Sequence, residues 1–368
     1  MLRVAFALIA VCVCLTVVAA QQPTKPAVTM DDIKKVWQER QDKVKTLKMT
    51  WKRTDVRPKG SMDLAVPFYH DDKIKTPQPP RDMRLTGEAT LTLSKGRFRY
   101  AHRSETWSIT DNAVKPFSQT AVYDGEEYRQ QESHVSDPEK EQAAIQSPAR
   151  AMMIEPELLE LKPIFWCAHG AKGPSGFDPL ADYEVTGRSV TSVGRVCVEL
   201  ESKSRTSGTL NRLLLISGSY LPQSLSVMRN GKLRCQLDIE YGLIGSNLVP
   251  DRWRYTSKDS AGHTEGSLEA TVTACEIGGP VGDETFRLSY RAGSVVVDLR
   301  DKTERLAVVL PDGTISESVE RRSVGSREEL IAATKPRVSR WWWLAGAVFC
   351  VIAAVAVYLI RRRRVRPA

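Results

Sequence analysis

Near the C-terminus, residues 341–360 form an uninterrupted run of twenty uncharged, mostly apolar residues. A helix of this length crosses a hydrocarbon core of about 30 Å. Arg340 precedes the run, and four arginines follow it at 361–364. A cluster of positive charge marks the cytoplasmic side, so the arginines at 361–364 belong there. This pattern predicts a transmembrane helix at 341–360, a basic cytoplasmic tail at 361–368 and an extracytoplasmic domain before the helix.

The N-terminus fits the same topology. Arg3 is followed by an apolar stretch at 4–18 and by the small residues Ala19 and Ala20. This is the pattern of a cleavable signal peptide at 1–20, with an uncleaved anchor as the alternative. The sequence therefore predicts a single-pass membrane protein whose main domain is periplasmic.

The net charge of +9 does not indicate nucleic-acid binding once the charges are located along the chain. Six of the nine positive charges lie on Arg3, on the run 361–364 and on Arg366, which leaves +3 for residues 21–340. Most of the excess thus belongs to segments that set membrane topology. We expect no nucleic-acid partner.

Four cysteines lie in the predicted exported part, at Cys167, Cys197, Cys235 and Cys275. An even number of cysteines in an oxidising compartment allows two disulfides, in any of three pairings. Four buried free thiols are the alternative, because the spacing is irregular and the domain is large. The chain has no C-x-x-C pair and its five histidines are widely spaced, so we expect no metal site and no cofactor.

One amphipathic helix is predicted at 29–45. Thr29 and Asp32 form a capping-box-like start. Ile33 and Trp37 fall on one stripe of the helix, which therefore has an apolar face to bury.

Beyond this helix the hydrophobic period changes to two, and tight turns punctuate the chain. Turn residues occur at 94–96, 124–125 and 230–231, the last being Asn-Gly. Prolines and charges at 55–84 indicate a loop-like insertion, and 139–169 is expected to be a broken helix. These features predict an α+β fold in which helices cover one face of a meandering antiparallel sheet.

Several motifs in this order resemble the lipoprotein-carrier superfamily, which includes the periplasmic lipoprotein chaperone and the outer-membrane lipoprotein receptor. They are R-F-R-Y, Y-L-P-Q-S-L, N-G-K-L, I-E-Y-G and L-V-P-D-R-W. The ending F-x-L-x-x-x-x-G-x-x-V-x-D is similar to that of planctomycete-type, membrane-anchored members. Its residues here are Phe286, Leu288, Gly293, Val296 and Asp298.

The resemblance implies a strongly curved antiparallel sheet of about ten or eleven strands, an unclosed β-barrel wrapped around helices. It assigns this half-barrel to residues 21–300, followed by a strand pair and stalk at 301–340. The family's concave apolar side accepts acyl chains, and the family has no catalytic residues.

An acyl-chain site needs a lining of apolar side chains that repack readily. The candidates share that character and lie in the apolar clusters of the domain. They are Trp37, Trp51, Phe98, Trp107, Met152, Met153, Leu158, Leu159, Phe165, Trp166 and Leu225. An ordinary core role is the alternative for each of them.

The sequence contains no G-x-S-x-G elbow, H-E-x-x-H motif, P-loop or G-x-G-x-x-G motif, so we expect no enzyme. The sequence-based hypothesis is a membrane-anchored, extracytoplasmic protein that holds a lipid, acyl chain or lipoprotein in an apolar half-barrel cavity. The alternative is an envelope sensor or interaction module that binds another membrane protein, similar to the anti-sigma-factor regulators. A third hypothesis, a hydrolase, would be supported by substrate turnover that a single substitution abolishes.

Overall fold

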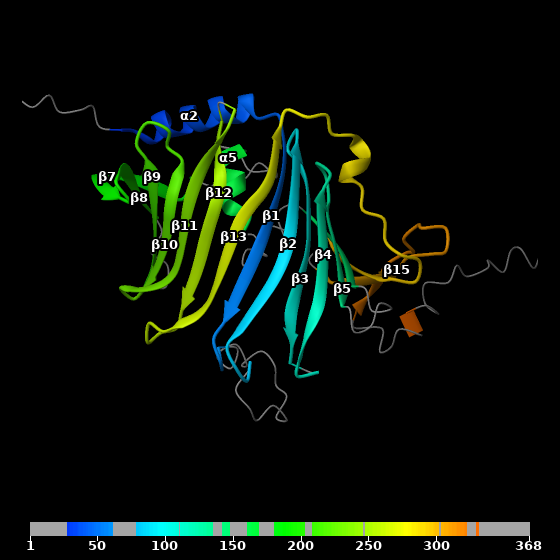
Figure 1. Cartoon of the computed structure of the whole chain (residues 1–368). Coiled ribbons are helices and arrows are strands. Elements are labelled where there is room, and N and C mark those ends of the chain that lie inside the picture. The colour runs from blue at the N-terminus through cyan, green and yellow to red at the C-terminus, as the bar shows by residue number, and fades with distance from the viewer. Residues whose placement is uncertain are drawn as a thin grey trace, which may run out of the picture.

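The structure is a computed structural model. It describes residues 28–61, 79–109, 111–134, 142–147, 160–168, 180–202, 208–245, 247–301, 303–321 and 329–330. These ranges form one sheet of sixteen strands, two α-helices and one short 3-10 helix (Figure 1).

The helices are α2 (Met30–Lys43), α5 (Lys162–Ala168) and the 3-10 helix η3 (Asp283–Phe286). The first half of the chain supplies β1 (Thr46–Arg57), β2 (Met83–Ser94), β3 (Arg97–Ser108), β4 (Ala113–Tyr123), β5 (Tyr128–His134) and β6 (Gln142–Gln146). The second half supplies β7 (Tyr183–Ser192), β8 (Arg195–Ser202), β9 (Thr209–Ile216), β10 (Pro222–Arg229), β11 (Lys232–Ile244), β12 (Asn247–Lys258) and β13 (Thr264–Ile277). Three short strands follow, β14 (Val295–Leu299), β15 (Arg305–Val308) and β16 (Val319–Glu320).

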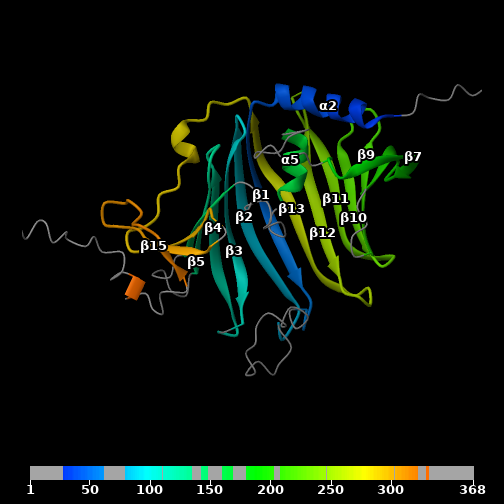
Figure 2. The same ribbon diagram turned by 180° about the vertical axis from the view of Figure 1, so that it is seen from behind.

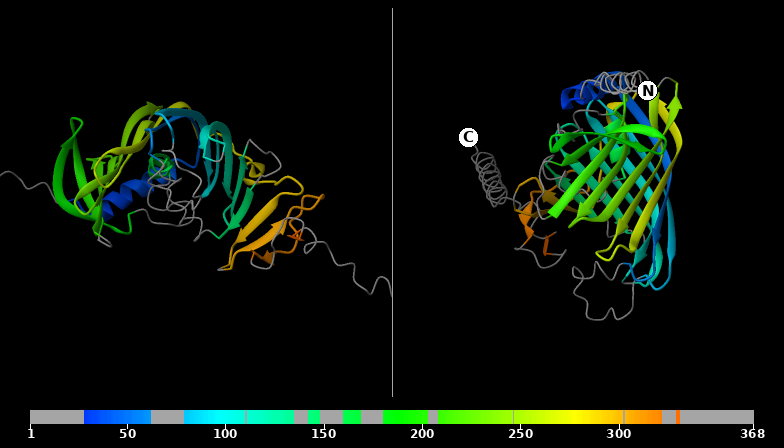
Figure 3. Two further views of the ribbon diagram at one scale, coloured as in Figure 1. Left: turned by 90° about the horizontal axis from the view of Figure 1, so that it is seen from below. Right: turned by 90° about the vertical axis from the view of Figure 1, so that its left-hand side faces the viewer.

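The order of strands places β1 inside the sheet. The chain meanders from β1 to β6 on one side, then reappears at the far edge as β7 and returns strand by strand to β13, which pairs with β1. The strand β14 adds to β6 in parallel, and β15 and β16 extend that side. The sheet is an arch whose edges, β7 and β16, do not meet (Figure 3).

The helix α2 begins where the capping box predicts. The Asp32 backbone N–H donates to Thr29 Oγ1 at 3.2 Å, and the Thr29 backbone N–H donates to Asp32 Oδ2 at 3.0 Å. Both bonds satisfy amide groups that a helix N-terminus leaves without partners. The helix buries Ile33 and Trp37 against the sheet, which confirms the predicted apolar face.

Two tight turns also form as the sequence predicts. Lys95 and Gly96, between β2 and β3, have φ of 49° and 79°, and Asn230 and Gly231, between β10 and β11, have φ of 52° and 75°. Two successive positive φ values are the geometry of a two-residue hairpin turn. These turns fix the register of the strands that they join.

The main core lies on the concave side of the arch, where α2 and α5 pack (Figures 2 and 3). Ala121 and Tyr123 of β4 belong to this core, whereas Val122 between them belongs to a second core. Successive side chains of a strand face opposite sides of the sheet. The second core, which includes Phe286 and Val296, therefore lies on the convex side.

The predicted α+β class is wrong, because the described chain is mostly β. The segment expected to be helical at 139–169 contributes the strand β6 as well as the short helix α5. Residues 301–340, expected to be a strand pair and stalk, add β15 and β16 to the main sheet. Sixteen strands in one unclosed sheet exceed the number that the resemblance implied.

The prediction of a single-pass membrane protein is likewise not supported. Within the described ranges no helix is long and apolar enough to cross a membrane. The longest, α2, has 14 residues, or about 21 Å at the helical rise against a core of about 30 Å. The predicted segments at 1–20, 341–360 and 361–368 lie outside the described residues. We therefore withdraw the membrane-anchored, periplasmic assignment.

Candidate functional site

Most of the apolar residues predicted to line a ligand cavity lie in the main core. Trp37, Trp51, Phe98, Trp166 and Leu225 are buried there. Phe165 packs against the same core, and Trp107 is half-buried near the end of β3. Met152, Met153, Leu158 and Leu159 lie outside the described residues. None of the seven described candidates lines the cavities presented below, and their role in holding an acyl chain stays a prediction.

The four cysteines are free thiols. Cys197 lies on β8 and Cys235 on β11, with two strands between them in the sheet. Three strand spacings amount to about 14 Å, twice the Cα separation of about 7 Å that a disulfide tolerates. Cys197 instead donates to Gln223 Oε1 at 3.0 Å, and Cys235 accepts from Tyr255 at 3.0 Å.

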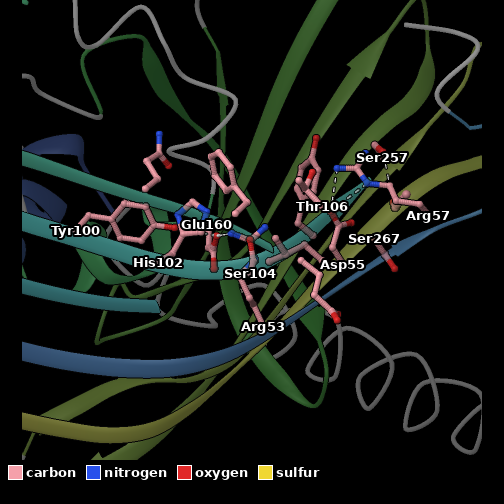
Figure 4. Close-up of a pocket in the computed structure, with 16 residues that line it drawn as sticks. Arg53, Asp55, Arg57, Tyr100, His102, Ser104, Thr106, Glu160, Ser257 and Ser267 are labelled. Carbon is pink, nitrogen blue, oxygen red and sulfur yellow. Dashed lines mark hydrogen bonds and ion pairs between the residues drawn. The ribbon is translucent and has the colours of Figure 1, made fainter. Parts of the chain in front are cut away.

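The concave face changes character along the strands. On β1 the inward side chains begin as the buried Leu47, Met49 and Trp51, and the alternation continues with Arg53, Asp55 and Arg57. The face is therefore apolar at the end that the helices cover and polar toward the other end. A cavity of about 340 Å³ opens on the polar half (Figure 4).

The lining of this concave cavity comes from β1, β3, β4, β12 and β13, together with the residue range just before α5. The residues are Arg53, Asp55, Arg57, Tyr100, His102, Ser104, Glu105, Thr106, Phe117, Gln119, Glu160, Tyr255, Ser257, Gly266, Ser267 and Leu268. The strand β2, between β1 and β3, places Gly87 opposite both Arg53 and Ser104. The lack of a side chain at Gly87 lets β3 approach β2 closely beside the site, because a Cβ there would lie 2.6 Å from Ser104 Cβ.

A buried carboxylate joins the apolar and polar halves. Glu160, 5% exposed, accepts from Trp51 Nε1 at 2.6 Å through Oε1 and from Arg53 at 2.6 Å through Oε2. Tyr100 donates to the same Oε2 at 3.4 Å. Burial, followed by the negative charge of Glu160, raises the pKa of Tyr100 well above its ordinary value, so that the phenol stays protonated. This network fixes the wall of the cavity.

His102 lies beside that network and is 8% exposed. Its Nδ1 atom is buried and has no hydrogen-bond partner. Burial, with the positive charge of Arg53 as the second cause, lowers the pKa of His102 from 6.5 to about 3. The ring is therefore neutral at pH 7, and its tautomer makes Nδ1 either a donor or an acceptor. An orphaned polar atom of this kind costs free energy unless a ligand satisfies it.

The two guanidinium groups of the cavity already have carboxylate partners. Arg53 pairs with Glu160, and Arg57 pairs with Asp55 at 2.9 Å. At the rim, Glu105 accepts from the Thr86 backbone N–H and hydroxyl. What remains for a ligand includes the hydroxyls of Ser104, Thr106 and Ser267 and the imidazole of His102, flanked by the Phe117 ring.

The cavity contains serine, histidine and carboxylate side chains, but they do not form a catalytic relay. A general base needs a pKa near the working pH and an orienting acid on its second nitrogen. His102 has a pKa of about 3 and no partner on Nδ1. The described residues also contain no group of three or more histidine, cysteine or acidic side chains placed to hold a metal ion.

Sequence reasoning missed Arg53, His102 and Glu160. For the first two a signal existed, because the period-two alternation of β1 and β3 continues from apolar residues into charged and polar ones on the same face. That pattern indicates a polar cavity beside a core. Glu160 gave no such signal, because it stands in the apolar stretch LLELKP, which suggested a core segment.

Comparison with known proteins reveals only remote likenesses. No protein-family model matches the chain, and no curated protein sequence matches it. The crystal structure of MucB is 13% identical over 77% of each chain, with a TM-score of 0.27. PNGF-II is 5% identical over 70% of this chain and 32% of its own, with a TM-score of 0.23. A porin-like protein from Bacteroides uniformis is 10% identical over 61% of this chain and 95% of its own, with a TM-score of 0.24.

At these TM-scores the likenesses are a weak structural relation and carry no argument about function. No family model supports the resemblance to the lipoprotein-carrier superfamily, which stays a prediction from the sequence. The function must therefore be argued from the concave cavity.

Proposed function

We propose that this protein is a non-catalytic binding module that receives an uncharged, polar segment of a partner protein in the concave cavity. The observation that carries the proposal is His102, whose buried Nδ1 lacks a partner in a cavity where both guanidinium groups are already paired with carboxylates. A bound segment would satisfy that atom once the imidazole turns it toward the cavity that His102 lines.

Charge argues against an ionic ligand. The cavity's guanidinium groups belong to the pairs Arg53–Glu160 and Arg57–Asp55. An anionic ligand would have to compete with those carboxylates, and a cationic one with those guanidiniums. Breaking the buried Arg53–Glu160 pair costs about 3–5 kcal/mol, so a ligand that leaves this pair intact, an uncharged one, is favoured.

The hydrogen-bonding groups suit a peptide. Ser104, Thr106 and Ser267 can each donate and accept, as can a backbone amide. The Phe117 ring offers an apolar contact beside them. The volume of about 340 Å³ lies at the lower end of the usual range for ligand pockets, about 300–1,000 Å³. The cavity thus fits a short stretch of polar chain better than a long acyl chain, which would leave these groups without partners.

A selection from random heptapeptides on the immobilised full-length chain tests the proposal. Selected peptides would be labelled, and their binding measured by fluorescence anisotropy. We expect uncharged polar consensus sequences. The double variant Ser104→Ala/Thr106→Val, which removes two cavity hydroxyls with little change in shape, should bind about 10-fold more weakly.

The matched control is Thr264→Val, an exposed threonine at the start of β13 that does not line the cavity. It should bind like the wild type. Equal binding by the double variant would overturn the assignment of the site, and so would selection of no binding peptide. A consensus that depends on a charged side chain would overturn the assignment of an uncharged ligand.

A further inference from the structure

A second cavity, of about 240 Å³, lies where α2 meets α5, the β9–β10 turn and the β11–β12 hairpin. We call it the α2 cavity. It shares no lining residue with the concave cavity. Its apolar part includes Leu47, Leu221 and Val249, which are buried, and Ile277. Its charged residues are Glu39, Arg40 and Lys43, all on α2.

Arg40 is half-buried without a balancing charge among the described residues. One guanidinium nitrogen donates to the Ser219 carbonyl at 2.5 Å, and another reaches the Trp166 carbonyl at 3.4 Å. Both partners are neutral. These bonds use two of the five N–H groups that a guanidinium carries, and Arg40 lines the cavity.

The ionisable groups that act electrostatically on the pKa of Arg40 are Cys167 and Tyr241. Neither supplies a negative charge. Burial raises the pKa of Cys167 to about 12 and raises that of Tyr241 well above its ordinary value, so both are neutral at pH 7. Burial also lowers the pKa of Arg40 itself. A desolvated cation without a counter-charge is costly unless a bound anion compensates it.

The other charges near the cavity compensate Arg40 only in part. Glu39 is exposed, so solvent screens its carboxylate. The C-terminus of α2 contributes the equivalent of about half a negative charge, which Arg40 shares with Lys43, the other basic residue of the last turn. The cavity therefore keeps a positive end beside an apolar floor.

We propose that the α2 cavity binds a carboxylate attached to a compact apolar group. The Arg40 guanidinium receives the carboxylate in a charge-assisted pair, and Leu47, Leu221 and Val249 receive the apolar group. At about 240 Å³ the cavity lies below the usual range for drug-sized ligands of about 300 Å³ and more, so the apolar group must be small. A free branched-chain acid and the C-terminal leucine of a peptide both have this chemistry. The inference does not depend on the proposed function.

The test compares acids with their uncharged amides on the full-length chain. The probes are 4-methylpentanoate and 4-methylpentanamide, acetate, and the tripeptide Ala-Ala-Leu with a free or an amidated C-terminus. Binding is followed by isothermal titration calorimetry and by the indole N–H signal of Trp37. That group donates to the Tyr220 carbonyl, next to Ser219, at 2.7 Å.

We expect each acid to bind at least about 10-fold more tightly than its amide, because the ionic hydrogen bond is lost. Acetate should bind more weakly than 4-methylpentanoate, because it lacks the apolar group. Arg40→Met should abolish the preference for the acid. Lys35→Met, at an exposed position of α2 outside the cavity, should retain it. If Arg40→Met does not fold, Lys43→Met gives a smaller loss of affinity.

Tight binding of the small acid alone identifies a free carboxylic acid as ligand, and tight binding of the tripeptide alone identifies a peptide C-terminus. Both results support the site. Equal binding of acid and amide, an unchanged preference in Arg40→Met, or no binding of any probe at 10 mM, about the weakest affinity worth measuring, would overturn it. In that case Arg40 only connects α2 to the Ser219 and Trp166 carbonyls.

Discussion

Glu160 and Arg53 form the charged pair on which the wall of the concave cavity depends. Their side chains are 5% and 15% exposed, and each also contacts the aromatic residues of the core. Removing one partner of such a pair leaves an uncompensated charge. We predict that Glu160→Gln lowers the free energy of unfolding by about 3–5 kcal/mol, measured by urea denaturation.

A double-mutant cycle separates this pair from its surroundings. Glu160→Gln combined with Arg53→Met should show a coupling energy of about 1–3 kcal/mol. The control pair is Arg254 and Glu269 on neighbouring strands, which are 62% and 39% exposed. Its coupling should stay below about 1 kcal/mol, because solvent screens it. Equal coupling in the two cycles would mean that Glu160 does not hold the cavity wall.

His102 should make stability depend on pH. Its pKa is about 3 in the folded chain against an ordinary value of 6.5, so between these values the unfolded chain binds more protons. Stability is therefore fully present above pH 6.5 and is lost as pH falls toward 3. We predict that His102 accounts for a loss of about 2 kcal/mol between pH 7 and pH 5.

The measurement is urea denaturation of the wild type and of His102→Gln at both pH values. The variant lacks the titrating ring, so its stability should change less between them. A parallel decline of both proteins would show that other groups cause the pH dependence.

At the scale of elements, β2 and β3 approach closely at Gly87. A Cβ at this position would lie 2.6 Å from Ser104 Cβ and 2.7 Å from the Arg103 carbonyl oxygen, closer than such atoms approach. Glycine inside a strand commonly marks a place where another backbone comes near. We predict that Gly87→Ala pushes β2 and β3 apart and lowers the free energy of unfolding by about 1–3 kcal/mol, measured by thermal or urea denaturation.

Gly266 on β13 is the matched control, because a Cβ there would meet its nearest atom at an ordinary 3.4 Å. Gly266→Ala should leave the free energy of unfolding unchanged or raise it by about 0.4–1 kcal/mol, because alanine lowers the conformational entropy of the unfolded chain. If Gly87→Ala were as harmless, β2 and β3 would not be in close contact beside the cavity.

The sequence predicts those elements whose structure is determined by residues close together in the chain. The capping box of α2, the Asn230-Gly231 turn and the alternation of β1 are set by residues near each other in the chain. The strand β6 could not be predicted, because a five-residue strand gains its stability from its neighbours β5 and β14, the latter about 150 residues away. Glu160 is beyond prediction for the same reason, since its partners lie more than 50 residues earlier.

At the scale of the molecule, the pairing of β1 with β13 joins the two halves of the sheet. It brings Leu47 opposite Ile277 and continues to Val56 opposite Ser267. Contacts between residues so far apart in the chain form late, because closing the loop between them costs entropy first. If this pairing holds the arch together, damage to β13 should destabilise both halves and not β13 alone.

Thr271 is the position at which to test this. It is exposed, so its side chain contributes little, and its backbone lies opposite Lys52 of β1 and Arg252 of β12. Proline there has no N–H to donate and is excluded from central strands. We predict that Thr271→Pro lowers the free energy of unfolding by at least about 1–3 kcal/mol. Hydrogen exchange should show protection falling together in β2–β5 and in β10–β12.

The comparison is Thr191→Pro in the edge strand β7, whose only neighbour among the described strands is β8. It should reduce protection in β7 and β8 alone, because an edge strand tolerates proline better. If Thr271→Pro also had a merely local effect, the halves β1–β6 and β7–β13 would fold independently. The concave cavity, whose lining comes from both halves, would then assemble only after the two had docked, and ligand binding would be lost before the secondary structure of either half.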